Sequence, residues 1–316
     1  MPLGIKKSEA DLWPHVVFEK CQICTGANKL IPLYSVFQED FSYLMGRCPV
    51  CSHLQVMQTQ AAAEKKREAH DYFQSTDVQD KKEWQSINSS WGDARSRAFR
   101  NIFRTLRELG FSRGLLLDVG SAFGHFLNMA RSQGYSVSGV EPSPSARRLA
   151  YDKFGIDSVS DIKDIKAEKL FDVIVCLETL YYIPDIRQML REIRDRLSPG
   201  GCFVLKMRAN RTGLFRFFSL LSHLRGVLMV VDPGTRLYNY SLRAYHLFMT
   251  KNIKLLITSA GFEIIKVVNE KQALTSSLTA TNIIKRIRIG LTVLVNSLSL
   301  GKIKIGTEIT IYAKRK

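Results

Sequence analysis

The stretch Leu115-Leu-Leu-Asp-Val-Gly-Ser-Ala-Phe-Gly124 decides the fold class of this chain. Its first half is a short apolar run with one acid, Asp118, as is typical of a strand buried in a parallel sheet. A glycine turn runs from Gly120 to Gly124, and a helical pattern then begins at His125. Strand, glycine turn and helix in this order let backbone amides approach a nucleotide-like ligand. The stretch therefore predicts an α/β fold with a ligand site at the end of this strand.

The segments after the turn continue the α/β pattern. Ser136–Val140 predicts a second strand, and Glu141 at its end is placed to accept hydrogen bonds from ribose hydroxyls. Strands that alternate with helices indicate a doubly wound, Rossmann-like sheet. The other expected strands are a third before Asp161, a fourth at Phe171–Leu177, a fifth at Cys202–Met207 after the turn Leu197–Gly201, and a closing pair at Ala260–Val268 and Glu308–Ala313.

The glycine turn excludes two common nucleotide sites. A dinucleotide fold needs G-x-G-x-x-G, but Ala122 and His125 occupy the second and third positions counted from Gly120. A P-loop needs G-K-[ST] after the turn, which is missing. The pattern D-x-G-x-x-x-G, followed by Glu141 and Pro142, resembles the class I S-adenosylmethionine (SAM)-dependent methyltransferases of type 11/23.

The resemblance implies a role for each part of the cofactor site. The backbone of the turn is expected to cradle the methionine portion of SAM, and Glu141 to bind its ribose. Asp118 is expected to orient the loop or the SAM ammonium, while Asp161 and Ile162 border the adenine. The middle glycine of the family's loop is replaced by alanine here. The implied cofactor-binding residues are Asp118, Gly120, Ser121, Ala122, Gly124, Glu141, Asp161 and Ile162.

The catalytic residues are less clearly marked. Many relatives carry Glu-His after the fourth strand, whereas this chain has Tyr181-Tyr-Ile-Pro184. Methyl transfer is an in-line displacement that chiefly needs two positioned reactants, with a general base only where the acceptor loses a proton. Both tyrosines can equally form a substrate platform or part of the core. The candidates are Glu178, Tyr181, Tyr182 and His246.

Four of the six cysteines form two pairs, Cys21-Gln-Ile-Cys24 and Cys48-Pro-Val-Cys51. Two such knuckles supply the four sulfur ligands of a closed, structural zinc site, with reduced thiols or a redox pair as the alternative. The segment between them contains the alternating run Tyr34–Phe37 and predicts a hairpin. The bacterial methyltransferase subgroup that the chain resembles carries a paired-cysteine module of this kind, and His53 is interpreted as a bystander.

The two remaining cysteines, Cys176 and Cys202, lie inside expected strands and are interpreted as core thiols. A cytosine-C5 methyltransferase needs a nucleophilic cysteine in an exposed loop, which neither position offers.

Three regions follow from these patterns: a zinc-ribbon-like module at 1–60, a helical linker at 61–110, and a SAM-dependent methyltransferase domain at 111–316 with a substrate insertion at 208–253. An amphipathic helix is expected in the linker. Its apolar face consists of Phe99, Ile102, Phe103, Leu106 and Leu109.

The net charge of +17 is unevenly distributed, because residues 1–200 sum to +2 and residues 201–316 to +15. The basic, apolar segments 208–231 and 282–296 are expected either to contact an anionic membrane or to pack as a lid or dimer surface. Nucleic acid is a less favoured partner, since these segments are rich in Leu, Ile and Val. No apolar run is long enough for a membrane span and the start shows no secretory leader. We expect a cytoplasmic protein. The alternative is a cytoplasmic protein that contacts the inner face of the membrane peripherally.

The resemblance implies a SAM-dependent methyltransferase that acts in glycan biosynthesis on a sugar, a glycan or a lipid-linked small molecule, at O, N or C. An RNA methyltransferase is one alternative. A module that binds SAM and a partner without catalysis is the other.

Overall fold

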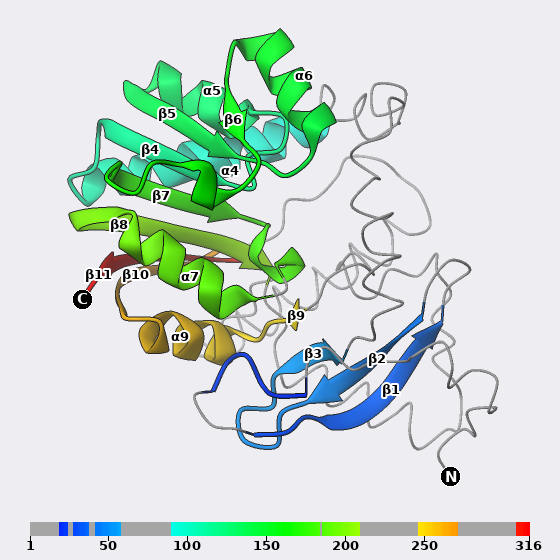
Figure 1. Cartoon of the computed structure of the whole chain (residues 1–316). Helices are drawn as coiled ribbons and strands as arrows, with labels where there is room; N and C mark the ends of the chain where they lie inside the picture. The colour runs from blue at the N-terminus through cyan, green and yellow to red at the C-terminus, as the bar shows by residue number, and fades with distance from the viewer. Residues whose placement is uncertain are drawn as a thin grey trace.

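The computed structural model describes residues 19–24, 28–37, 42–57, 90–183, 185–208, 246–270 and 308–316. These residues form a seven-stranded sheet and a smaller four-stranded sheet (Figure 1). Most of the insertion expected at 208–253, the basic segment 282–296 and residues 61–89 of the expected linker lie outside the described residues.

The large sheet is a doubly wound, mixed sheet. From one edge to the other its strands are β10 (Phe262–Glu270), β11 (Glu308–Arg315), β8 (Leu197–Arg208), β7 (Phe171–Leu177), β4 (Gly114–Val119), β5 (Tyr135–Val140) and β6 (Ser158–Val159). The five strands from β8 to β6 are parallel, β11 is antiparallel to β8, and β10 is antiparallel to β11. Chain order reverses beside β4, so a ligand site is expected at the carboxyl ends of β4 and its neighbours. The fold predicted from the sequence, including the closing strand pair, is confirmed.

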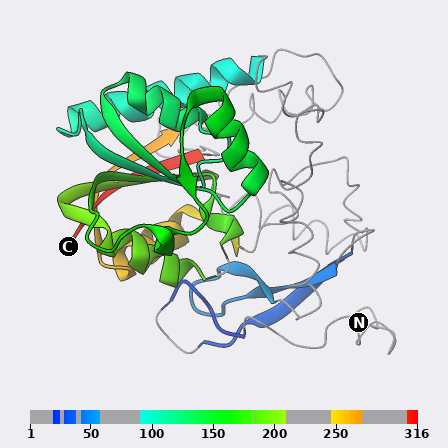
Figure 2. The same cartoon turned by 45° about the horizontal axis from the view of Figure 1, so that its top comes forward.

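Helices cover both faces of this sheet (Figure 2). One face is buried under α4 (Ser90–Glu108) and α5 (His125–Ser132), where the rings of Phe103 and Phe126 stack with centroids 4.9 Å apart. The other face is covered by α7 (Ile186–Asp195) and α9 (Thr250–Ser259), while α6 (Pro144–Phe154) follows β5. The amphipathic helix predicted in the linker is α4. None of the described helices has the length and apolarity needed to cross a bilayer.

The start of β8 differs from the sequence-based expectation. A turn was predicted at Leu197–Gly201, but strand pairing begins at Leu197, opposite Phe171, and the register then shifts before Val173. A Cβ atom on Gly201 would lie 2.9 Å from the Ser198 carbonyl oxygen, so the backbone folds back closely on itself there. Gly200, which follows Pro199, has a left-handed φ of 76°, so the predicted turn is present but lies inside β8, between the pairing at Leu197 and the pairing at Cys202.

The small sheet joins the N-terminal module to a distant part of the chain. Strands β1 (Ile31–Phe37), β2 (Ser42–Arg47) and β3 (Leu54–Met57) form an antiparallel meander, and β9 (His246–Leu247) pairs with β3. The predicted hairpin is the pair β1 and β2, whereas the sequence did not predict β9. One buried hydrophobic cluster contains the cysteines together with residues of α7 and α9. The module therefore packs against the α7 and α9 side of the large sheet (Figure 1).

Candidate functional site

The turn after β4 is held in shape by β5 and β7. The amides of Gly120 and Ser121 both donate to the Val140 carbonyl oxygen, at 2.8 and 3.0 Å. Gly120 has a φ of 84°, and a Cβ atom there would lie 2.3 Å from Oγ1 of Thr179. Only glycine allows the backbone to approach the end of β7 this closely. The amides of Gly120 and Ser121 thus fix the shape of the loop. The expected cradle for the methionine portion of SAM depends on this backbone shape.

The second half of the turn meets Glu141. Ala122 has a left-handed φ of 45°, which accounts for the glycine that the resembled family carries at this position. Its amide donates to Glu141 Oε2 at 2.8 Å, and the Ser143 amide donates to Oε1 at 2.9 Å. Gly124 then caps α5 with a φ of 74°. The structure thus brings the glycine turn and Glu141 together, as the resemblance implies.

Asp118 lies at the end of β4 and is almost completely buried, with 3% of its surface exposed. Among the described residues, no hydrogen-bond partner reaches its buried Oδ1 atom. Burial, with a smaller contribution from the charge of Glu141, raises the pKa of Asp118 to about 8. An isolated buried carboxyl group is unfavourable, and a cation beside it stabilises its charged form. Two acids at this edge of the sheet therefore fit a ligand such as SAM, which carries a sulfonium, an ammonium and a ribose diol.

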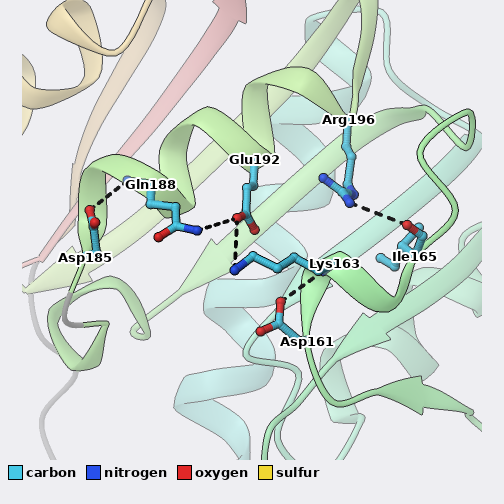
Figure 3. A network of polar contacts seen from close by, with 7 residues as sticks. All are labelled: Asp161, Lys163, Ile165, Asp185, Gln188, Glu192 and Arg196. Atoms are coloured by element: carbon cyan, nitrogen blue, oxygen red, sulfur yellow. Dashed lines mark hydrogen bonds and ion pairs between the residues drawn. The ribbon is translucent and has the colours of Figure 1, made fainter.

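The turn after β6 lies at the same edge of the sheet, because the Glu141 amide donates to the Val159 carbonyl oxygen at 2.9 Å. Asp161 is exposed and caps the short helix η3 (Ile162–Asp164) by accepting from the Lys163 amide at 2.9 Å, while Ile162 is fully buried. Figure 3 shows how this turn is tied to α7: Lys163 Nζ lies 3.8 Å from Glu192 Oε1. The structure therefore places the turn that carries Asp161 and Ile162 at the same edge of the sheet as Glu141.

The opposite side of the site is formed by the end of β7 and the short helix η4 (Leu180–Tyr182). Glu178 has a left-handed φ of 58°, which is a strained conformation for a residue with a side chain. The Tyr181 hydroxyl donates to Glu178 Oε2 at 2.9 Å. The rings of Tyr181 and Tyr182 meet edge to face at an angle of 66° with centroids 4.5 Å apart, and Tyr182 is 41% exposed. The structure thus joins three of the four catalytic candidates in one turn, next to Gly120.

His246, the fourth candidate, lies in β9 beside η4 but is fully buried. Its Nδ1 atom is 3.3 Å from Nε2 of His53, and the two rings stack with an angle of 21° between their planes. Phe248 contacts both rings. Burial, with the nearby His246 as a smaller cause, holds the pKa of His53 well below its ordinary value. His53, which the sequence indicated as a bystander, is therefore the partner of His246, and a base role for His246 stays a prediction.

The four paired cysteines form one cluster, in which all sulfur atoms lie within 4.8 Å of one another. Cys21 and Cys51 are 3.6 Å apart and Cys24 and Cys48 are 3.4 Å apart, between their Sγ atoms. A tetrahedral zinc ion with Zn–S bonds of about 2.3 Å places its sulfur ligands about 3.8 Å from one another. The Ile23 amide also donates to Cys21 Sγ at 3.3 Å, which supports a thiolate. This donor set fits a zinc ion.

The remaining two cysteines are core thiols, as predicted. Cys176 and Cys202 are fully buried in β7 and β8. Burial raises the pKa of both thiols above the ordinary value, which disfavours the nucleophilic thiolate.

Three further residues at or near the site were not predicted from the sequence. Ser143 caps α6 by accepting from the Ala146 amide, and its position just before Pro144 was an available signal. Thr179 packs against Gly120, and Arg187 at the start of α7 donates to the Ile23 carbonyl oxygen of the first cysteine knuckle. No sequence pattern marks these last two, because their contacts depend on how the elements pack.

Comparisons with known proteins show that the chain belongs to a methyltransferase family. The methyltransferase domain family Methyltransf_23 matches residues 91–267. The mitochondrial ubiquinone biosynthesis O-methyltransferase of Schizosaccharomyces pombe is 28% identical over 145 residues, which cover 42% of this chain and 52% of that protein. The sterol 4-C-methyltransferase strm-1 of Caenorhabditis elegans is 29% identical over 98 residues, 28% of this chain and 29% of that protein. The chain thus spans about half or less of the length of the curated relatives it matches.

A solved structure shares the fold. The magnesium protoporphyrin IX methyltransferase from Synechocystis PCC 6803 with bound SAH superposes with a TM-score of 0.50 at 16% sequence identity. The alignment covers 79% of this chain and 100% of that chain. The likeness therefore includes nearly the whole of a SAM-dependent methyltransferase fold.

Proposed function

Because this chain belongs to the methyltransferase domain family, we propose that it transfers a methyl group from SAM to an acceptor at the carboxyl ends of its parallel strands. The observation that carries this proposal is the buried carboxyl group of Asp118, whose Oδ1 atom lacks a partner in the described part of the chain. Glu141 lies next to it at the end of the neighbouring strand. A ligand that is cationic near Asp118 and carries a diol near Glu141 suits both acids.

SAM supplies an electrophilic methyl group on a sulfonium centre. The protein's part in such a displacement is to align the acceptor with that methyl group and to keep water away. Where the acceptor is a hydroxyl or an amine, it must also lose a proton. The Glu178 and Tyr181 pair is the described pair best placed to take that proton, because it lies at the end of β7 beside the glycine turn.

For the acceptor, we propose a sugar, a glycan or, most strongly, a lipid-linked small molecule. The excess of basic residues in 201–316 supports an anionic group on the acceptor or on the surface that presents it. Relatives named for ubiquinone biosynthesis and for a sterol support an apolar portion. A lipid-linked acceptor with a phosphate or sugar head combines both properties.

Label transfer tests the function and the acceptor class together. Purified protein is incubated with methyl-labelled SAM and either a bacterial lipid extract or total RNA. We expect label in the lipid fraction. Label in the RNA fraction would replace the proposal with RNA methylation, and SAM binding without transfer to either extract would favour a binding module. Failure of the protein to bind SAM would overturn the proposed activity altogether.

For the four-cysteine cluster, we propose a structural zinc ion. All four ligands come from the protein, so no position remains open for a substrate or a reactive water. Metal analysis of the purified protein tests the assignment: one zinc ion per chain is expected, and a metal-free wild-type protein would exclude it.

A further inference from the structure

A hydrogen bond joins the first cysteine knuckle to the start of α7. Arg187 lies in the first turn of this helix, and its guanidinium donates to the carbonyl oxygen of Ile23, between Cys21 and Cys24. Hydrogen bonds from a charged donor are stronger than neutral ones, and this one joins residues 164 positions apart. α7 begins only a few residues after η4, so the knuckle holds the downstream end of the turn that carries Tyr181.

The second knuckle is linked to η4 indirectly, through β9. Within the knuckle, the Cys48 amide donates to the His53 carbonyl oxygen at 2.9 Å. The His53 ring then contacts His246 of β9, and β9 packs against η4. Both rings are fully buried, so this contact is shielded from water.

The two knuckles are also tied to each other. Gln55 of β3 accepts from the Gln22 amide at 3.0 Å and donates to the Lys20 carbonyl oxygen at 3.3 Å. Leu180 and Tyr181 of η4 belong to the same buried cluster as three of the cysteines. By contrast, the described hydrogen bonds of the turn from Gly120 to Gly124 lie within the turn, to the end of β5, to Glu141 and to Ser158 of β6, and none of them involves the cysteine module.

We propose that the four-cysteine module is a positioning element for the acceptor side: when the cysteines are loaded with metal, Arg187 and the two buried histidines hold η4 in place. In this proposal the module acts through the Glu178–Tyr182 turn. This inference rests on the proposed function, because that function makes η4 the acceptor side. Without metal the four sulfur atoms have no common centre, so the Ile23 carbonyl and the His53 ring lose their fixed positions.

Hydrogen–deuterium exchange of the full-length protein tests this coupling without an identified acceptor. Exchange is followed in peptides covering residues 178–190 and residues 115–128, with the affinity for S-adenosylhomocysteine measured alongside by calorimetry. The variants are Arg187→Gln, the donor-retaining Arg187→Lys, and Arg191→Gln as the control one turn along the same helix. Wild-type protein treated with a zinc chelator provides the metal-free state.

For Arg187→Gln and for the chelated protein, we expect exchange at 178–190 to rise about tenfold or more, with little change at 115–128. Affinity for S-adenosylhomocysteine should change less than about threefold, Arg187→Lys should recover most of the protection, and Arg191→Gln should match the wild type. Unchanged exchange at 178–190 in Arg187→Gln overturns the inference, as does an equal rise in both peptides, which reports general destabilisation. A wild-type protein that does not bind S-adenosylhomocysteine overturns the proposed function instead, whatever the exchange shows.

Discussion

The proposed cofactor side and the proposed acceptor side of this site are built in different ways. The cofactor side consists of three strand ends and the turns that follow them, all within residues 114–164, and its hydrogen bonds run between neighbouring strands. The acceptor side combines the end of β7, the start of α7, β9 and the cysteine module, which come from widely separated parts of the sequence.

This difference indicates that the two sides serve different purposes. A site made from adjacent strand ends is as rigid as the sheet itself, which suits a cofactor that is the same in every member of the family. A site assembled from distant segments can change one segment without disturbing the sheet, which suits an acceptor that differs between members. Changes in the module should therefore affect the acceptor side, and changes in the glycine turn the cofactor side.

Among changes to the two sides, the removal of one cysteine ligand should have the largest effect on zinc content and stability. We expect Cys48→Ser to lower the zinc content to near zero and the free energy of unfolding by roughly 3 kcal/mol or more, because a closed metal site contributes directly to folding. Metal analysis and thermal unfolding measure both changes. Cys202→Ser, in the buried core of β8, is the matched control and should retain its zinc.

A substitution in the glycine turn should have the next largest effect, and this effect should be a loss of affinity for SAM. Gly120→Ala places a methyl group against Thr179 and forces the turn to move, so the affinity for SAM should fall roughly a hundredfold. Calorimetry measures this loss. Gly134→Ala is the control, since Gly134 has a similar φ of 92° but nothing within 4 Å of an added Cβ atom. Equal losses in both variants would show that backbone strain, and not the contact with Thr179, explains the effect.

The raised pKa of Asp118 should make the stability of the folded protein depend on pH. Its pKa is raised to about 8 in the folded protein, above the ordinary 3.8, so the folded state holds the proton more tightly than the unfolded state. The stability that this group contributes is therefore greatest below about pH 4 and is lost as the pH rises towards 8. We expect the stability of Asp118→Asn relative to wild type to increase by about 1 kcal/mol or more between pH 5 and pH 7.

Thermal unfolding at a series of pH values measures this trend without SAM present. Asp157→Asn, an exposed acid beside β6, should follow the wild-type profile. A constant difference between Asp118→Asn and wild type across this range would mean that Asp118 is already ionised in the free protein.

The ion pair between the adenine-side turn and α7 should have the smallest effect. The Lys163 side chain is 60% exposed, so solvent screens its attraction to Glu192. We expect Lys163→Gln to change the affinity for SAM by less than about threefold. A tenfold loss would show that this pair positions Asp161 for the cofactor.

The cofactor side was largely predictable from the sequence because its signals are local. The apolar run, the glycine turn and Glu141 follow one another within one strand–helix–strand unit, and each has a pattern of its own. The isolation of Asp118 was not predictable, since it depends on which atoms the folded chain brings around the carboxyl group. The left-handed φ of Glu178 was equally hidden, because no pattern marks a side chain in a conformation that favours glycine.

The acceptor side was predicted only in parts. The paired cysteines identify their own cluster, but a strand as short as β9 has no periodicity from which to predict its pairing with β3. The base role of His246 stays a prediction, and its contact with His53, 193 positions away in the sequence, was not predicted. The Ser-Pro-Gly-Gly turn was predicted from its residue types, but its inclusion in β8 was not, because the pairing of Leu197 with Phe171 depends on how the strands pack.

Calorimetric titration of SAM into the full-length wild type and Glu141→Gln tests most directly that the ends of β4 and β5 form a cofactor site. We expect one SAM to bind per wild-type chain, and Glu141→Gln to bind at least about tenfold more weakly, because a charged acceptor for the ribose hydroxyls is lost. A wild-type protein that releases no heat of binding, or two proteins of equal affinity, would contradict this assignment.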